Sequence, residues 1–214
     1  MRTIIGIVGY YGFVRAYPLG PELMERLRAL PWPKEVEIRE MNWGPVAIVQ
    51  DFQASDVKPD RVVLVGALDR GLARGTVSRR QWMGAALDPS AVQLRMFEAV
   101  TGVISLDNLL VIGAHFGVWP PQTYTVELQW VESGLGDLVL GEVESIGTGQ
   151  VVGEQPLSPE NERFVRRLVE SIRVLALDKA PPDVQPIGVE QLTPVAAVLH
   201  HRFHNDLGLN DEHL

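Results

Sequence analysis

Residues 60–77 read DRVVLVGALDRGLARGTV, and this stretch decides the fold class. Arg61 to Leu68 form an apolar run rich in valine, which predicts a strand buried on both faces of a sheet. Turn residues follow at once, beginning with Asp69 and Gly71. Strands buried on both faces are typical of parallel sheets that are covered by helices on two sides. The stretch therefore favours the α/β class.

The chain before this stretch alternates between strand and helix patterns. Thr3 to Val8 is another short apolar, β-branched run, which we expect to form a buried strand. The Gly-Pro-Glu sequence at 20–22 favours a helix start, because Pro suits the first helical position and Glu suits the positive end of the helix dipole. Right-handed crossovers then place the strand at 3–8 between those at 35–41 and 61–68, all three parallel. A short helix is expected at 44–52.

The chain after residue 77 continues the alternation of strands and helices. A Ser-Pro-Glu helix start at 158–160 opens a long helix that reaches Leu175. We predict a three-layer α/β/α sandwich with a mostly parallel twisted sheet in residues 1–177, followed by a C-terminal arm in 178–214, partly helical or extended. The other expected segments are an edge strand or extended excursion at 74–82, helices at 89–100 and 107–116, a strand at 123–131, a glycine-rich loop with one hairpin at 134–153, and a helix in the arm at 195–203.

Composition limits the classes of function. With 214 residues, of which 46% are hydrophobic and 21% charged, the chain can bury one sizeable core, and we expect one domain. The absence of cysteine excludes disulfides, thiolate metal sites and a cysteine nucleophile. A net charge of -8 argues against nucleic acid as a partner, since phosphate backbones select clustered Lys and Arg. Without a long apolar stretch or a signal cleavage pattern, we expect no membrane association and a cytoplasmic location.

The order of these features resembles the nickel-iron hydrogenase maturation endopeptidases over about residues 3 to 175. In that family the third strand reads Asp-Arg-Val-Val-Leu-Val-Asp-Ala, followed by a Gly and a Pro-Gly-Thr-Val turn. This chain has the same pattern at 60–67 and 74–77, except that Gly66 replaces the strand-end Asp and Arg74 replaces the turn Pro. A first strand ending in glycines, a Gly-Pro helix start and a Leu-Ser-Pro-Glu start of the last helix complete the resemblance.

The resemblance implies a metal site built from three ligands at the strand ends: a carboxylate in the first loop, the Asp closing the third strand and a His before a later helix. It also implies that this site detects nickel in the large hydrogenase subunit before the C-terminal extension is removed. The corresponding positions here are the carboxylate-free stretch 16–21, Gly66 and the region of Gly102, so all three ligands are missing. Because such ligands must converge to hold a metal, we expect neither a metal nor another cofactor.

The favoured interpretation is a protease-like protein that is proteolytically inactive and binds a [NiFe] hydrogenase large subunit or a related assembly partner. The alternative is an active endopeptidase that processes the large subunit, with a site rebuilt from Asp69, Asp107 and His115, or from the tail histidines His200 and His204. Turn chemistry is the simpler explanation of Asp69, and a structural or surface role is the simpler explanation of the histidines. A weaker alternative is a flavodoxin-like small-ligand binder unrelated to hydrogenases.

Aromatic residues gather in the loops that follow the first two predicted strands. The carboxyl ends of the strands are where open parallel sheets bind their ligands. Aromatic side chains there are candidates for a partner-binding surface, and packing of the loops against each other is an equal alternative. The five candidates are Tyr10, Tyr11, Phe13, Tyr17 and Trp43.

Overall fold

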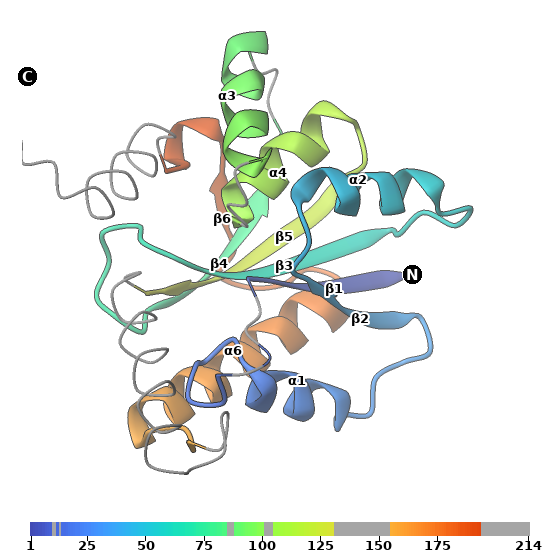
Figure 1. Cartoon of the computed structure of the whole chain (residues 1–214). Coiled ribbons are helices and arrows are strands. Elements are labelled where there is room, and N and C mark those ends of the chain that lie inside the picture. The colour runs from blue at the N-terminus through green and yellow to red at the C-terminus, as the bar shows by residue number, and fades with distance from the viewer. Residues whose placement is uncertain (10–11, 13, 85–87, 101–104, 131–154, 194–214) are drawn as a thin grey trace, which may run out of the picture.

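The computed structural model describes residues 1–9, 12, 14–84, 88–100, 105–130 and 155–193. Six strands form one sheet in the order β2-β1-β3-β5-β4-β6, with helices on both of its faces (Figure 1). The strands are β1 (Thr3–Val8), β2 (Val36–Met41), β3 (Arg61–Leu68), β4 (Val77–Trp82), β5 (Gln122–Gln129) and β6 (Gln185–Ile187).

The pairing of the strands confirms the predicted topology. β1 lies between β2 and β3 and is parallel to both, and β3 is parallel to β5. β4 runs antiparallel to β5, and β6 is parallel to β4. The sheet is therefore mostly parallel, as the buried apolar runs predicted.

Two layers of helices complete the predicted α/β/α sandwich. α1 (Pro21–Arg28) and α6 (Pro159–Leu177) cover one face of the sheet, on the lower side in Figure 1. α2 (Pro45–Ala54), α3 (Pro89–Val100) and α4 (Leu106–His115) lie on the other side. No described helix is long and apolar enough to cross a membrane.

Local sequence signals explain where three of these helices begin. α1 starts with Pro21 directly after Gly20, and Glu22 lies in its first turn, where a negative charge is favourable. α4 and α6 are each capped by a serine, Ser105 and Ser158, whose side chain accepts a hydrogen bond from the backbone N–H three residues later. Such caps contribute about 1 kcal/mol each.

The alternation of side chains along β3 divides the core into two halves. Val63 and Val65 point to the α6 face and pack in the same cluster as Leu168, while Val62 and Leu64 pack with α4 on the opposite face. All four strand residues are fully buried. Burying each such side chain stabilises the fold by about 1.5 to 3 kcal/mol, which is why β3 can serve as the centre of the sheet.

The C-terminal part of the described chain differs from the expected appended arm. β6 pairs with β4, and Ile187 is completely buried in the core on the α4 face. As a result β4 is an interior strand of the sheet, and the expectation that residues 74–82 form an edge strand is wrong. The expected hairpin at 134–153 and the expected helix at 195–203 lie outside the described residues.

Candidate functional site

The candidate site lies at the carboxyl ends of β3 and β5, where open α/β sheets place their ligands. β3 ends at Leu68 and is followed by Asp69 and Arg70. The N-terminus of α4 faces the same edge and contributes Asp107. β5 contributes Glu127 from near its end.

Gly66, which replaces the Asp of the family pattern, is in contact with α4. A Cβ atom added at Gly66 would lie 3.1 Å from the Cβ of Leu106, which is closer than ordinary van der Waals contact. Leu106 is buried and belongs to the core on this face. The space beside the end of β3 is therefore filled by an apolar side chain from the neighbouring helix.

The guanidinium of Arg70 is held between two buried carboxylates. Its Nη2 donates to Asp107 Oδ1 at 2.6 Å and its Nη1 to Asp107 Oδ2 at 2.8 Å, a bidentate geometry. Its Nε donates to Glu127 Oε2 at 3.2 Å. The side chains of Arg70, Asp107 and Glu127 are only 8%, 2% and 3% exposed.

A second arginine balances the charge of this cluster. Arg80 Nε donates to Glu127 Oε2 at 3.1 Å, so two guanidinium groups face two carboxylates. Burial lowers the pKa of Arg70, but the hydrogen bonds and charges of Asp107 and Glu127 outweigh it and hold that pKa above its ordinary value. We name Arg70, Arg80, Asp107 and Glu127 the arginine-carboxylate cluster. Its carboxylates are already neutralised by groups of the chain itself.

The segment that follows β6 is hydrogen-bonded to this cluster. Thr193 N donates to Asp107 Oδ2 at 2.8 Å, and Arg70 Nη1 donates to the carbonyl oxygen of Gln191 at 3.2 Å. Arg95 of α3 donates to the carbonyl oxygen of Thr193. Both main-chain polar groups of Thr193 are thus bound by buried side chains. The polar side chains at the carboxyl ends of the strands, where a ligand is expected, are therefore hydrogen-bonded to the chain's own main-chain groups.

The three candidates for a rebuilt catalytic site do not converge in the structure. Asp69 is exposed and accepts hydrogen bonds from Gly71 N at 2.9 Å and Gln129 Nε2 at 2.7 Å, which together lower its pKa. Asp107 and His115 lie eight residues apart near opposite ends of α4, about 12 Å along the helix axis. Asp69 thus stabilises a turn, as in its simpler explanation, and Asp107 is an ion-pair partner of Arg70.

Metal-ligating side chains do not gather elsewhere in the described part of the chain. No group of three His, Asp or Glu side chains that could hold a metal ion is found there. His115 is exposed at the C-terminal end of α4, with its ring edge-on to Phe116 at 5.1 Å between centroids. His200 and His204 lie outside the described residues.

The aromatic candidates separate into different environments. Tyr17 is only 4% exposed and packs edge-to-face against Trp130, with 5.8 Å between the ring centroids. It is a core residue, so the prediction that it belongs to a partner-binding surface is wrong. Trp43 is 54% exposed at the end of β2 and agrees with a surface role. Tyr10, Tyr11 and Phe13 lie outside the described residues.

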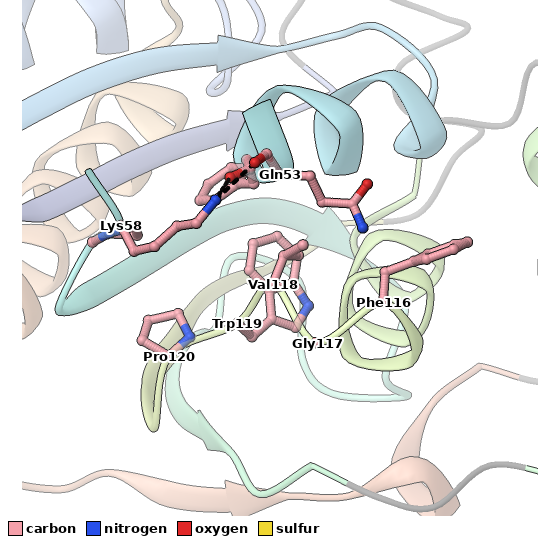
Figure 2. A pocket seen from close by; sticks show the side chains of 9 residues that line it. Gln53, Lys58, Phe116, Gly117, Val118, Trp119 and Pro120 are labelled. Atoms are coloured by element: carbon pink, nitrogen blue, oxygen red, sulfur yellow. Dashed lines mark hydrogen bonds between the residues drawn. The ribbon is translucent and has the colours of Figure 1, made fainter. Parts of the chain in front are cut away.

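A hollow of about 420 Å³ opens at the amino ends of β3 and β5, at the other end of these strands from the candidate site. Its lining includes Phe52. Figure 2 shows Lys58 and Trp119 among the other lining residues. Lys58 Nζ donates to the carbonyl oxygens of Phe52 and Gln53 at 2.6 and 2.9 Å, which satisfies the C-terminal end of α2. The lysine therefore has a structural role, and this hollow is not at the carboxyl ends of the strands.

Sequence reasoning named Asp107 but missed the arginines that surround it. A signal was present, because Glu127 and Gln129 stand two apart in a strand that alternates polar and apolar residues, and so point to the same face. Buried carboxylates need a cationic or hydrogen-bonding partner. Arg70, directly after the candidate Asp69, was the nearest available cation at that sheet edge.

Comparison with known proteins identifies similar solved structures. The hydrogenase maturating endopeptidase HybD from Escherichia coli aligns with 17% identity over 80% of this chain and 90% of its own, at a TM-score of 0.44. The endopeptidase HycI from Escherichia coli aligns with 19% identity over 89% and 99% of the two chains, at 0.47. The [NiFe] hydrogenase maturation protease HycI from Thermococcus kodakarensis aligns with 19% identity over 83% and 93%, at 0.41. No protein-family model and no curated protein matches the chain.

Proposed function

We propose that this protein is a hydrogenase maturation protease-like protein that binds a [NiFe] hydrogenase large subunit, or a related assembly partner, without cleaving it. The class of partner rests on the sequence resemblance at residues 60–77. The absence of cleavage rests on what fills the strand-end site in this chain. These two parts have separate support and are tested by separate readouts.

One observation carries the proposal: the cation held by Asp107 is the guanidinium of Arg70. A metal ion would have to displace both Arg70 hydrogen bonds, at 2.6 and 2.8 Å, and also the Thr193 N–H at 2.8 Å. Asp107 is 2% exposed, so the displaced groups would lose their partners in a place that water does not reach. Asp107 is therefore a poor metal ligand in this fold.

The other positions near the strand end also do not fit a metal. Gly66 has no side chain, and its neighbour Leu106 fills the adjoining space with carbon. Nickel and zinc sites in proteins need several converging nitrogen, oxygen or sulfur ligands. The residues at the end of β3 therefore do not fit a metal ion.

A binding function needs exposed groups, and Trp43 is the one candidate aromatic that the structure shows at the surface. Exposed aromatic side chains are frequent anchors of protein interfaces because they bury a large area at small entropic cost. We propose Trp43, with Tyr10, Tyr11 and Phe13 from the first loop, as the partner-binding residues. Tyr17 is excluded from this set by its burial.

The test uses the full chain and a purified hydrogenase large-subunit precursor that carries its C-terminal extension. The two are mixed with and without Ni²⁺, complexes are separated by size exclusion, and the precursor's intact mass is measured. A hydrogenase maturation endopeptidase with its metal ligands serves as the positive control for cleavage. We expect a complex in which the precursor keeps its full mass. Loss of the extension would establish the active-endopeptidase alternative, whereas an uncleaved precursor that forms no complex would refute the assigned partner.

A further inference from the structure

We propose that two copies of this chain associate through β2, pairing antiparallel across a two-fold axis at Ile38 and joining their sheets into one. The proposal concerns a surface that is separate from the arginine-carboxylate cluster but adjoins Trp43. It does not depend on the proposed function, because its test measures association of the chain with itself in the absence of any other protein. It follows from the open edge of the sheet, the direction of its main-chain groups and the order of its charges.

β2 is the outermost strand at its end of the sheet, and β1 is its one neighbour among the described strands (Figure 1). A hollow of about 570 Å³ runs beside it, lined by residues of β2 and by Trp43 and Asp51. The outer side of this strand is therefore open to solvent. Open strand edges are templates for pairing with another chain.

The hydrogen bonds to β1 determine which main-chain groups of β2 face outward. Thr3 N donates to the carbonyl oxygen of Glu35 at 2.8 Å, and Thr3 is in register with Val36. In a parallel ladder with this register, residues 35, 37, 39 and 41 bond to β1, so residues 36, 38 and 40 point away from it. The Val36 N–H closes a turn on the carbonyl oxygen of Pro33 at 3.0 Å. Both groups of Ile38 and Glu40, and the carbonyl of Val36, remain directed toward a neighbouring strand.

A two-fold axis at Ile38 satisfies these outward groups. The Ile38 residues of the two copies face each other as a hydrogen-bonded pair, exchanging N–H and C=O. The Glu40 N–H of each copy reaches the Val36 carbonyl of the other. The Ile38 side chains, partly buried on the α1 face in each copy, meet at the axis and cover each other.

The charges on the opposite face of β2 select the same register. Glu37 of one copy then lies directly opposite Arg39 of the other, and this occurs twice. These are non-hydrogen-bonded pairs, in which side chains approach closely and opposite charges attract. Within one copy Arg39 donates to Glu37 at 2.6 Å and to Asp51 at 2.7 Å, so the pairs across the axis would extend an ion-pair network that already lies on this face of β2.

Other registers are unfavourable for the same residues. An axis at Glu37 or at Arg39 would place that residue opposite its own copy, giving like-charge repulsion. An axis at Val36 would place Glu37 opposite Glu35 of the second copy. Charged side chains often keep edge strands from pairing, but Glu37 and Arg39 of β2 stand in a self-complementary order, so in this register they attract a second copy. A second copy of this chain is therefore the occupant that the edge fits.

The decisive test uses two charge-reversal variants. Each should dimerise poorly on its own, and the two should form a dimer when they are mixed. Glu37→Arg makes the facing positions all positive, and Arg39→Glu makes them all negative, so each variant repels itself. Mixed in equal amounts, the two variants restore both opposite-charge pairs. We expect wild type to sediment as a dimer, each variant to raise the dimer dissociation constant by at least about tenfold, and the mixture to return to wild-type affinity.

The controls carry the same charge changes on α6, away from β2. Glu170→Arg and Arg163→Glu are exposed positions and should leave the dissociation constant unchanged. Glu40→Pro removes one outward N–H without touching the ladder to β1, and should also weaken dimerisation, since edge strands tolerate proline there. Melting temperatures establish that each variant is folded. A wild type that stays monomeric at millimolar concentration, reversals that remain dimeric, or a mixture that does not re-associate would each overturn the proposal.

Discussion

The guanidinium of Arg70 donates hydrogen bonds to both carboxylate oxygens of Asp107, at 2.6 and 2.8 Å. Asp107 lies 37 positions further along the chain. This pair links the end of β3 to the start of α4. Because both side chains are buried, the pair determines which chemistry is available at the strand-end site.

Replacing Arg70 with Met should destabilise the fold strongly. The substitution leaves Asp107 and Glu127 buried without their shared cation, and breaking one side of a buried ion pair costs about 3 to 5 kcal/mol. Urea unfolding followed by circular dichroism measures the change in free energy of unfolding. Arg163→Met, at an exposed position on α6, is the matched control and should change it by less than about 0.5 kcal/mol. Equal effects of the two substitutions would contradict the arrangement described for the cluster.

Introducing at Gly66 the aspartate of the endopeptidase pattern that residues 60–67 resemble should not create a metal site. The new side chain would press on Leu106, whose Cβ lies 3.1 Å from the position of the added Cβ, and it would bring a carboxylate into an apolar space. Gly66→Asp should therefore lower stability by about 2 kcal/mol or more. Gly66→Ala isolates the steric part, and Leu106→Ala combined with Gly66→Asp should recover some stability. Isothermal titration with Ni²⁺ and Zn²⁺ should show no new site, and stoichiometric binding by Gly66→Asp would argue against the proposed loss of metal chemistry.

Glu98 should make stability depend on pH. Burial raises the pKa of Glu98 above its ordinary value near 4.5, against the lowering influence of Arg95. The folded protein therefore holds this proton more tightly than the unfolded chain, so the contribution of Glu98 is largest below the unfolded pKa and is lost as pH rises through the folded pKa. As the pH rises above the ordinary pKa of a glutamate, wild type should lose stability relative to Glu98→Gln. Unfolding experiments at increasing pH measure the difference, and a difference that does not vary with pH would show that the pKa is not raised.

Tyr17 and Trp43 were both predicted to bind a partner, but replacing each with Ala should affect stability in one case and partner capture in the other. Tyr17→Ala removes a ring packed against Trp130 in the core and should cost about 3 kcal/mol of stability. Trp43→Ala removes an exposed ring and should leave the melting temperature nearly unchanged, yet weaken capture of the large-subunit precursor by about tenfold or more. Met83→Ala, at another exposed apolar position, should not affect capture. If Trp43→Ala captures the precursor as well as wild type does, the partner-binding surface lies elsewhere.

The central fold was predictable because its strongest signals are local and continuous. The apolar runs at 3–8 and 61–68 identify strands buried on both faces, and the handedness of the crossovers then places β1 between β2 and β3. The position of β4 was not predictable in this way. It depends on β6, which has three residues, one of them Pro186, and no periodic pattern that distinguishes it from a loop.

The site was harder to predict because its groups come from distant parts of the chain. Gly66 could be identified from the sequence as a departure from a strong local pattern, and the structure shows that Leu106 packs beside it. Asp107 was identified as a candidate, but its partner is fixed by the meeting of two loops and a helix terminus, which no local spacing encodes. Tyr17 was predicted to lie on the surface because the sequence of a loop does not show whether its aromatic side chains face solvent or the core.

The cation beside Asp107 is covalently part of the chain, so it is always present. A bound metal ion exchanges with its surroundings, so a site that uses one can be full or empty and can report which state it is in. The guanidinium stays with the chain and keeps its charge at any accessible pH. It neither responds to chelators nor varies with the supply of metal in the cell. The cation beside Asp107 is therefore the same in every molecule.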